Sequence, residues 1–329
     1  MFKAIILRRD ESSITQARLE SISSDELPQG EIQIDVAYST LNYKDALAVT
    51  GKAPVVRQWP MIPGIDLAGV ITNSSDDRYS PGQAVVVNGH GMGEVRWGGL
   101  AQKASVSADW ITPLPDGLSM ADAMSIGTAG YTAMLSVLAL ERNGITPESG
   151  PILVTGANGG VGGFALALLS KRGYDVVAST GRVNETAGLL ALGAREVIAR
   201  ETLSEKGKPL QKEQWAGAVD CVGSHTLANI CAQMRYGGVV TACGLAQGMD
   251  FPATVAPFIL RGVTLVGIDS VYAPESLRNQ AWQCLAKETN APMREQIATT
   301  VLTLAQSIDA AHDLLAGRIK GRLMVNVNA

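Results

Sequence analysis

The chain has 329 residues, of which 46% are hydrophobic and 18% charged, and its formal net charge at pH 7 is −4. This length allows two domains with separate cores, and the small negative charge excludes a general attraction to nucleic acid or to an anionic membrane surface. We expect no apolar run long enough to span a membrane and no signal peptide, and therefore a cytoplasmic protein.

Short strands separated by turn signals dominate the first 120 residues. We predict strands at residues 3–7, 31–38, 67–72, 84–88 and 100–106. Their spacing is typical of an antiparallel, barrel-like domain rather than of alternating strands and helices. Residues 119–140 are rich in alanine and predict a helix, with Ser119 and Asp122 as a capping pair.

From residue 151 onward, strands and helices alternate. We predict strands at residues 152–154, 176–179, 196–199, 217–221, 238–243 and 264–268, which together indicate a doubly wound parallel sheet. A helix at 274–287 follows, and residues 296–327 have strand, helix (308–315) and strand character. We therefore expect one domain formed by residues 1–122 and 296–329, and a second formed by residues 123–295.

A glycine-dense turn follows the first of these strands. Gly156, Gly159 and Gly162 are spaced three residues apart, between the apolar strand and a helical apolar run. Such glycines allow a sharp turn and close approach of a pyrophosphate, which the N-terminus of the helix also favours. We predict that this glycine turn binds a dinucleotide; an ordinary tight turn is the alternative.

The end of the next strand distinguishes NAD from NADP. An acidic residue there would accept a hydrogen bond from the 2′-hydroxyl of NAD, and none is present. Ser179, Thr180, Gly181 and Arg182 instead offer hydroxyls and a guanidinium, which suit a 2′-phosphate. We therefore predict NADPH, with Arg200 as a second basic contact. The alternative is that both arginines are solvated surface charges.

The four cysteines lie in the second half of the chain and show no CxxC spacing. They are typical of reduced, mostly buried thiols, and they imply neither a disulfide framework nor a zinc site.

Several motifs together carry a resemblance to a known family. They are LNYKDA (41–46), PMIPGID (60–66), GANGGVG (156–162), PFILRGV (257–263), GIDSV (267–271) and IKGR (319–322). Over nearly its full length the chain resembles the medium-chain dehydrogenase/reductase superfamily, and within it the zinc-independent quinone oxidoreductase-like group and its acrylyl-CoA reductase branch. The resemblance implies an α/β protein with a GroES-like antiparallel β-barrel domain and a Rossmann domain, a homodimer, and NADPH as cofactor.

The resemblance also implies the residues that contact the cofactor. They are Tyr43, Gly159, Gly160, Val161, Gly162, Thr180, Gly181, Arg182, Arg200, Leu245, Ile259, Ser270 and Arg322. In this interpretation Asn42 and Asp45 flank the nicotinamide cleft together with Tyr43.

Three positions depart from the zinc-dependent relatives. Asn42 stands where those proteins have a cysteine ligand, Asp66 ends a Gly-Ile-Asp where they have Gly-His-Glu, and Thr50 stands where they have a histidine before glycine. Asp66 and a distant His90 cannot assemble the three ligands of a catalytic zinc. We therefore predict no metal.

Hydride transfer to an electron-poor alkene requires a polarised carbonyl, so that the developing enolate is stabilised. Asn42, Arg322 or backbone N–H groups are candidates for this contact, and Tyr43 or a water held by Asp45 for the proton source. If residues 42–45 form a strand, neighbouring side chains point to opposite faces, and only two of the three face the cleft. A capping or buried ion-pair role for Asp45, and a core position for Tyr43, are the alternatives.

We predict that the protein reduces the C=C bond of acrylyl-CoA to give propanoyl-CoA, using NADPH. Lys52 and Arg57 add positive charge near the expected cleft mouth, which suits a CoA phosphate and equally an ordinary surface. One alternative is a quinone or enone oxidoreductase, and another is an NADPH-binding protein with a structural or regulatory role. In each case we expect a small-molecule partner, and neither nucleic acid nor membrane.

Overall fold

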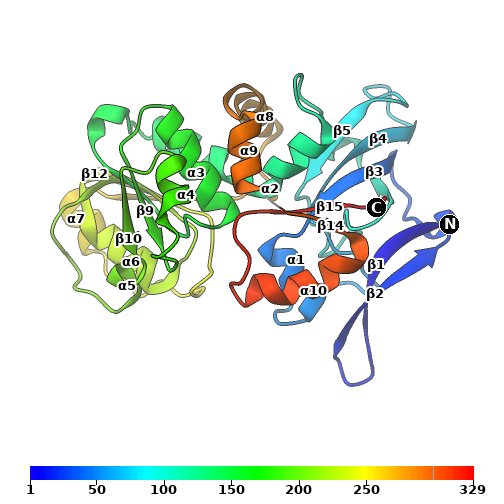
Figure 1. Ribbon diagram of the computed structural model, residues 1–329, viewed down its shortest axis with the longest axis horizontal. Helices are drawn as coiled ribbons and strands as arrows, with labels where there is room; N and C mark the ends of the chain where they lie inside the picture. The colour runs from blue at the N-terminus through cyan, green and yellow to red at the C-terminus, as the bar shows by residue number, and fades with distance from the viewer. Residues whose placement is uncertain (299) are drawn as a thin grey trace. The chain divides into compact units, whose positions relative to one another are not determined.

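The structure, a computed structural model, describes residues 1–298 and 300–329 (Figure 1). The chain divides into two units. Unit 1 comprises Met1–Thr128, Ser270–Ala286 and Ile297–Ala329, and unit 2 comprises Ala129–Asp269 and Lys287–Gln296. Each unit contains a sheet of its own, as the sequence predicts.

Unit 1 is built on a mostly antiparallel sheet. Its strands run in the order β14-β15-β3-β4-β5-β7, with β6 paired to β3. A separate hairpin joins β1 to β2. The bounds of these strands are β1 Phe2–Arg9, β2 Thr15–Ile22, β3 Ile32–Thr40, β4 Asp66–Ser74, β5 Ala84–Asn88, β6 Lys103–Val106, β7 Thr112–Pro113, β14 Thr300–Thr303 and β15 Leu323–Asn326.

Alternation of buried and exposed residues explains why this sheet has a core face. Along β3, Ile32, Ile34 and Val36 are buried, whereas Gln33 and Asp35 between them are exposed. A period of two places the apolar side chains on one face, where they pack against helices α1 (Tyr43–Thr50) and α10 (Leu304–Leu315). Removal of this apolar surface from water is the main stabilisation of the unit.

Three elements of unit 1 do not appear among the sequence predictions: β2, α1 and the two-residue strand β7. Strand β2 lies mostly at the surface, so its hydrophobic pattern is weak. Helix α1 has only eight residues and lies where we considered a strand. Short 3-10 turns complete the connections: η1 Ser24–Glu26, η2 Ala108–Trp110 and, in unit 2, η3 Pro147–Ser149.

Unit 2 is a doubly wound parallel sheet with strand order β10-β9-β8-β11-β12-β13, which confirms the predicted Rossmann fold. Its strands are β8 Ile152–Val154, β9 Val176–Thr180, β10 Glu196–Ala199, β11 Trp215–Asp220, β12 Met234–Ala242 and β13 Thr264–Gly267. The helices that follow them are α3 Gly160–Lys171, α4 Thr186–Ala191, α5 Glu201–Ser204, α6 Ser224–Gln233, α7 Ala256–Arg261 and α9 Ala291–Ile297.

Helix α8 (Glu275–Glu288) shows how the chain returns to unit 1 earlier than the predicted domain boundary. The Trp282 indole donates to Asn88 Oδ1 at 3.1 Å, and the Arg278 guanidinium donates to the Asn88 carbonyl at 2.9 Å. Both donors are buried, and Asn88 ends strand β5. The segment from Ser270 therefore packs with the antiparallel sheet.

Helix α2 (Met120–Arg142) is broken at Gly127, which has φ +51° and ψ −161°. This conformation is accessible almost only to glycine. The helix meets the length and composition of a membrane span, contrary to our expectation that no run would, but the whole of its apolar window is buried inside the protein. A core helix passes the same test.

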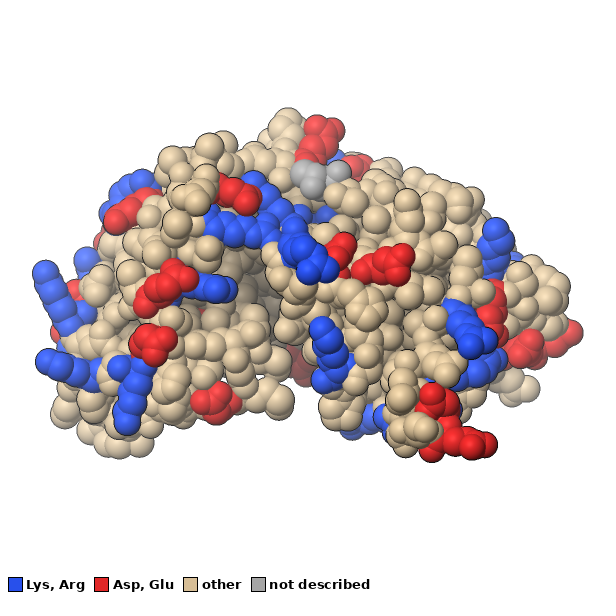
Figure 2. Space-filling model, turned by 60° about the horizontal axis from the view of Figure 1, so that its bottom comes forward, with Lys and Arg blue, Asp and Glu red and all other residues tan. Residues whose placement is uncertain are grey.

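The charged side chains follow the composition of the chain. On the face shown in Figure 2, basic and acidic residues are interspersed. Several of them form surface ion pairs, such as Arg8 with Glu20 and Lys103 with Asp35. Exposed pairs of this kind contribute little to stability.

We predict that Gly127→Ala lowers the free energy of unfolding by about 3 kcal/mol or more. A Cβ at this position would lie 2.1 Å from Arg322 Nη2 and 3.1 Å from Asp66 Oδ2, in addition to its strained backbone. The matched control is Gly117→Ala, in the same unit, where φ is +84° and no atom lies within 4 Å of the new Cβ; here we expect a loss of about 1 kcal/mol. Urea unfolding of both variants checks this, and equal losses would contradict it.

Candidate active site

Asn42 begins the polar cluster of unit 1 as the N-cap of α1. Its backbone is extended (φ −91°, ψ 167°), and its N–H donates to Asp45 Oδ2 at 2.8 Å, as in a capping box. Our assumption that residues 42–45 form a strand is therefore wrong. Asn and Asp three residues apart are typical of a helix start, and this signal was present in the sequence.

Asp45 is almost fully buried, and both its carboxylate oxygens accept backbone hydrogen bonds. Oδ1 accepts from the N–H groups of Gly64 and Ile65 at 3.1 and 3.0 Å, so the side chain also fixes the turn before β4. Burial, together with the nearby Asp66 carboxylate, raises the pKa of Asp45 to about 7. The capping role considered in the sequence analysis matches these contacts, and a catalytic role for Asp45 stays a prediction.

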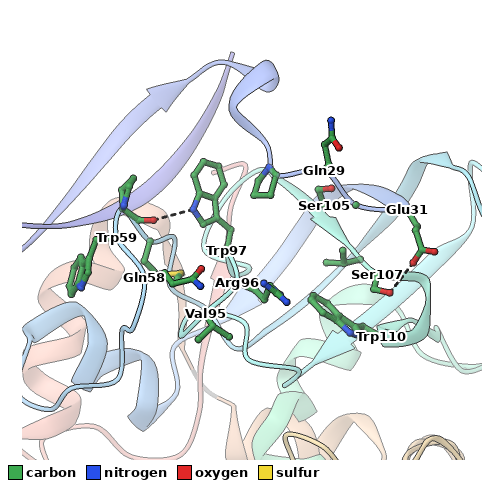
Figure 3. Close-up of a pocket in the computed structure, with 15 residues that line it drawn as sticks. Gln29, Glu31, Gln58, Trp59, Val95, Arg96, Trp97, Ser105, Ser107 and Trp110 are labelled. Carbon is green, nitrogen blue, oxygen red and sulfur yellow. Dashed lines mark hydrogen bonds between the residues drawn. The ribbon is translucent and has the colours of Figure 1, made fainter.

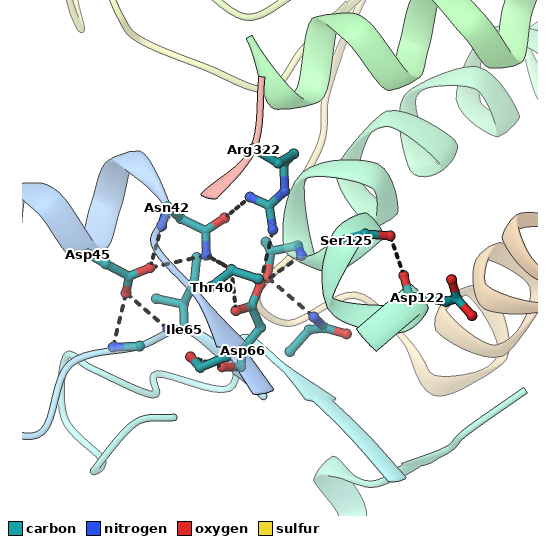
Figure 4. Close-up of polar contacts among 12 residues, drawn as sticks. Thr40, Asn42, Asp45, Ile65, Asp66, Asp122, Ser125 and Arg322 are labelled. Atoms are coloured by element: carbon teal, nitrogen blue, oxygen red, sulfur yellow. Dashed lines mark hydrogen bonds and ion pairs between the residues drawn. The ribbon is translucent and has the colours of Figure 1, made fainter. Parts of the chain in front are cut away.

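Asp66, the first residue of β4, connects three segments of unit 1 (Figure 4). It is completely buried and accepts from Thr40 Oγ1 at 2.6 Å, Asn42 Nδ2 at 3.2 Å and the Thr128 N–H at 2.8 Å. Thr128 follows the break in α2, so the N–H at the start of the resumed helix donates to the carboxylate. The partial positive charge of a helix N-terminus stabilises an anion at this place.

Arg322 brings a cation into the same cluster. Its Nη1 donates to Asn42 Oδ1 at 2.7 Å, and its Nη2 lies 4.0 Å from Asp66 Oδ2. The side chain is only 3% exposed, and within the described part of the chain Nε and Nη2 have no hydrogen-bond partner. Burial lowers the pKa of Arg322, and the carboxylates of Asp66 and Asp45 oppose this. Two buried donors without acceptors are rare in proteins, because leaving such groups unsatisfied is costly.

The donor set of this cluster does not fit zinc. Asp45 and Asp66 already accept hydrogen bonds at both oxygens, and the Arg322 guanidinium supplies the compensating positive charge. Among residues 1–298 and 300–329, no three His, Cys, Asp or Glu side chains are grouped as a metal site. A catalytic zinc needs three such ligands.

Tyr43 lies beside this cluster as the first residue of α1. It is 43% exposed, so it is not the core aromatic considered as the alternative. The next residue, Lys44, forms a 2.7 Å ion pair with Glu94. Tyr43 therefore presents its ring to solvent or to a ligand.

In unit 2 the glycine turn joins β8 to α3 as predicted. Gly156 has φ +60°, and Gly159 is the N-cap of α3. A Cβ on Gly162 would lie 2.4 Å from the Gly156 carbonyl oxygen, so only glycine allows the helix to pack this closely on the turn. The first turn of α3 contains no acidic residue, so the N–H groups at its N-terminus suit a phosphate.

The turn after β9 gathers the residues predicted to bind a 2′-phosphate. Thr180 Oγ1 accepts from Asn158 Nδ2 at 2.9 Å and from the Arg182 N–H at 3.0 Å. The Arg200 side chain lies over Gly181, where an added Cβ would be 2.8 Å from Arg200 Nε. Arg200 is largely exposed and pairs with Glu201 at 3.2 Å. The structure therefore brings Thr180, Gly181, Arg182 and Arg200 together.

The remaining predicted cofactor residues are not joined to this turn. Leu245, after β12, and Ile259, on α7, are exposed apolar residues of unit 2. Ser270, Tyr43 and Arg322 belong to unit 1. Their contact with a cofactor stays a prediction.

The sequence patterns did not identify the buried hydroxyl and carboxylate groups whose hydrogen bonds fix the residues of both sites. In unit 1 these are Thr40 and Asp66. In unit 2, buried Asp220 accepts from Thr155 Oγ1 at 2.6 Å and from the Gly223 N–H at 2.8 Å, which fixes the loop after β11. A polar residue at the end of a buried strand is a usable signal, because burial without hydrogen-bond partners is costly.

Two family models match the chain. The alcohol dehydrogenase GroES-like domain matches residues 28–116, and the zinc-binding dehydrogenase model matches residues 160–287. Acrylyl-CoA reductase AcuI of Ruegeria pomeroyi is 49% identical over 331 residues, which cover 100% of both chains.

Two solved structures are similar over nearly their whole length. Escherichia coli K-12 YhdH with bound NADPH has a TM-score of 0.96 and 48% identity, covering 99% of this chain and 100% of that one. Bacillus subtilis YhfP with NAD bound has a TM-score of 0.94 and 45% identity, covering 99% of each chain. The latter is also described as a putative quinone oxidoreductase.

We predict that Asp45 makes stability depend on pH. Because folding raises its pKa from 3.8 to about 7, the folded protein holds a proton between these values that the unfolded chain has lost. The contribution of Asp45 to the free energy of unfolding therefore falls as the pH rises from about 4 to about 7, by up to about 1.4 kcal/mol per pH unit. Asp45→Asn removes this titration.

Urea unfolding of the wild type and of Asp45→Asn at about pH 5 and about pH 8 checks this prediction. We expect the difference in free energy of unfolding, wild type minus variant, to be larger at the lower pH. Asp116→Asn, at an exposed carboxyl of the same unit, serves as the control. A difference between wild type and Asp45→Asn that is constant with pH would contradict the prediction.

Proposed function

Since the chain belongs to the medium-chain dehydrogenase/reductase superfamily, as its full-length identity with AcuI shows, we propose that it is an NADPH-dependent reductase of acrylyl-CoA. The reaction would reduce the activated C=C bond and give propanoyl-CoA. The observation that carries this proposal is the buried guanidinium of Arg322, whose Nε and Nη2 lack acceptors within the described residues.

Unit 2 supports NADPH as the cofactor. The turn at Gly159 to Gly162 and the N-terminus of α3 suit the pyrophosphate. Thr180 and Arg182 follow β9 in place of an acidic residue, and Arg200 lies over the same turn. The structure of Escherichia coli YhdH contains NADPH, which agrees with this preference. The structure of Bacillus subtilis YhfP contains NAD, so the preference of this chain for NADPH needs a test.

NADPH, when bound, supplies the hydride that the β-carbon receives. The chain's own residues would do the rest. Arg322 donates to the thioester carbonyl oxygen and stabilises the negative charge that develops there, while Asn42 holds the guanidinium through Nη1. Tyr43, exposed beside this group, delivers the proton to the α-carbon. Asp45 acts through Asn42, whose backbone and side chain it fixes.

This chemistry is proposed to be independent of zinc. Arg322 provides the electrophilic contact that a metal provides in zinc-dependent relatives, and Asn42 and Asp66 are engaged with each other and with Thr40. A quinone or enone oxidoreductase is the second candidate. It is favoured by the 45% identity with YhfP, described as a putative quinone oxidoreductase.

We also propose that the protein is a cytoplasmic homodimer. Strand β13 lies at the edge of the six-stranded sheet, and Val255 and Leu260, at the start of α7 and on it, are exposed. Pairing of two β13 edges across a twofold axis would cover the unpaired edge of the sheet and the exposed apolar side chains. Sedimentation velocity checks this, and a monomer at micromolar concentration would contradict it.

The first test of function compares acceptors. We expect the absorbance of NADPH to fall much faster with acrylyl-CoA than with crotonyl-CoA or a small quinone at equal concentrations. Turnover with the quinone alone would reject the proposal and favour the second candidate. In Arg322→Lys, which keeps the charge but loses the planar fork of donors, we expect kcat to fall by about 10²-fold. An unchanged kcat would remove Arg322 from the mechanism.

We predict that Arg182→Ala weakens NADPH binding by roughly 30-fold and leaves the Kd of NADH within about twofold, because the proposed partner of the guanidinium is the 2′-phosphate, which NADH lacks. Calorimetric titration with each cofactor measures this. Arg195→Ala is the control, since Arg195 is an exposed arginine already paired with Asp175. Equal weakening of NADPH and NADH would remove the basis for choosing NADPH.

A further inference from the structure

A second candidate binding site lies within unit 1. It is a pocket of about 560 Å³, a volume that suits a small-molecule ligand. Three of the five tryptophans of the chain line it: Trp59, Trp97 and Trp110 (Figure 3). All three indoles are half-buried, so part of each ring stays accessible.

Each of these rings is held by a contact of its own. The Arg9 guanidinium lies 4.9 Å from the centroid of the Trp59 ring, and Trp97 Nε1 donates to the Pro60 carbonyl at 3.2 Å. Trp110 stacks on His90, with centroids 5.5 Å apart and planes 7° apart. Burial lowers the pKa of His90 to about 4, so this partner is neutral at pH 7. Rigid aromatic surfaces bind a planar ligand with little loss of entropy.

The lining of the pocket carries one basic residue, Arg96, and one acidic residue, Glu31. Arg96 lies between Trp97 and Trp110 in Figure 3, and it is exposed. It makes no ion pair with any of the described acidic residues. The carboxylate of Glu31 is held by two hydrogen bonds. It accepts from Ser107 Oγ at 2.8 Å and from the Ala108 N–H at 3.0 Å.

More cations lie at the other side of Trp59. A smaller pocket of about 220 Å³ shares this tryptophan and is lined by Arg9 and Lys52. Arg57 precedes Gln58 and Trp59 in the chain and is exposed. As with Arg96, none of these three forms an ion pair with a described acidic residue. Arginine and lysine side chains without ion pairs, next to accessible indole rings, suit a purine that carries several phosphates.

We propose that this surface binds the adenine nucleotide portion of coenzyme A, with the base against the indoles and the phosphates on Arg96 and the neighbouring cations. The inference rests on the proposed function in naming coenzyme A as the carrier. It goes beyond it in assigning a nucleotide site that is separate from the cofactor turn of unit 2.

The pocket is connected to the acyl end of the proposed site through contacts inside unit 1. Lys44, next to Tyr43, pairs with Glu94, and the Glu94 carbonyl accepts from the Arg57 N–H at 2.9 Å. Glu94 is followed by Val95 and Arg96 of the pocket wall. A pantetheine arm crossing this ion pair would join the thioester beside Tyr43 to a nucleotide in the pocket.

The test measures binding of coenzyme A to the full chain saturated with NADP⁺, so that the turn of unit 2 is occupied. We expect Arg96→Glu to raise the Kd of coenzyme A by about tenfold or more, and to leave the Kd of NADPH unchanged. Arg18→Ala, at an exposed arginine of β2, should change neither constant. Trp110→Leu, which removes the ring, should weaken coenzyme A by about tenfold.

Further ligands identify the part that is recognised. Pantetheine alone should bind equally to the wild type and to Arg96→Glu, while ATP competition with coenzyme A would show that any adenine nucleotide is accepted. Failure of acrylyl-CoA turnover would reject the proposed function but leave these binding measurements valid. Absence of coenzyme A binding to the NADP⁺-saturated wild type, or a Kd unaffected by Arg96→Glu, would overturn the site.

Discussion

A carboxylate in a protein interior must be compensated by hydrogen bonds or by a cation, and Asp66 obtains both from parts of unit 1 that are distant in the chain. Thr40 comes from the end of β3, Asn42 from the cap of α1, Thr128 from the break in α2, and Arg322 from the segment before β15. None of these segments can shift without leaving a buried group unsatisfied. The positions of Asn42 and Arg322, and with them the proposed chemistry, depend on this one side chain.

The two candidate sites are built by different means. In unit 2 the backbone forms the site, because glycines in the turn after β8 expose N–H groups and let α3 approach closely. In unit 1 side chains form the site, held by the hydrogen bonds that Asn42 makes to Asp66 and to Arg322. A backbone site tolerates little change at its glycines, whereas a side-chain network fails when any one member loses its partner.

This difference explains how much the sequence predicts. The parallel strands, the glycine turn and the basic turn after β9 follow from local patterns, and the structure has all of them. The role of Asp66 does not follow, because its partners lie 26, 24 and 62 residues away in the chain. Helix α1 is shorter than the window in which a helical period can be recognised, although Asn42 and Asp45 mark its start. The pocket of three tryptophans combines loops whose proximity only the fold creates.

Strand β15 lies inside the sheet of unit 1, between β14 and β3, and Arg322 directly precedes it. All of unit 2 is placed between the first part of unit 1 and these last strands in the order of synthesis. On the ribosome, β3 can pair with β4 and β6 soon after it is made, but Tyr38, Ser39 and Thr40 at its end must wait until residues 324–326 of β15 have been made, whereas the six strands of unit 2 have their partners earlier. The end of β3 that leads into Asn42 therefore lacks its β15 partner during this interval, and the proposed chemistry is absent until Arg322 and β15 are in place.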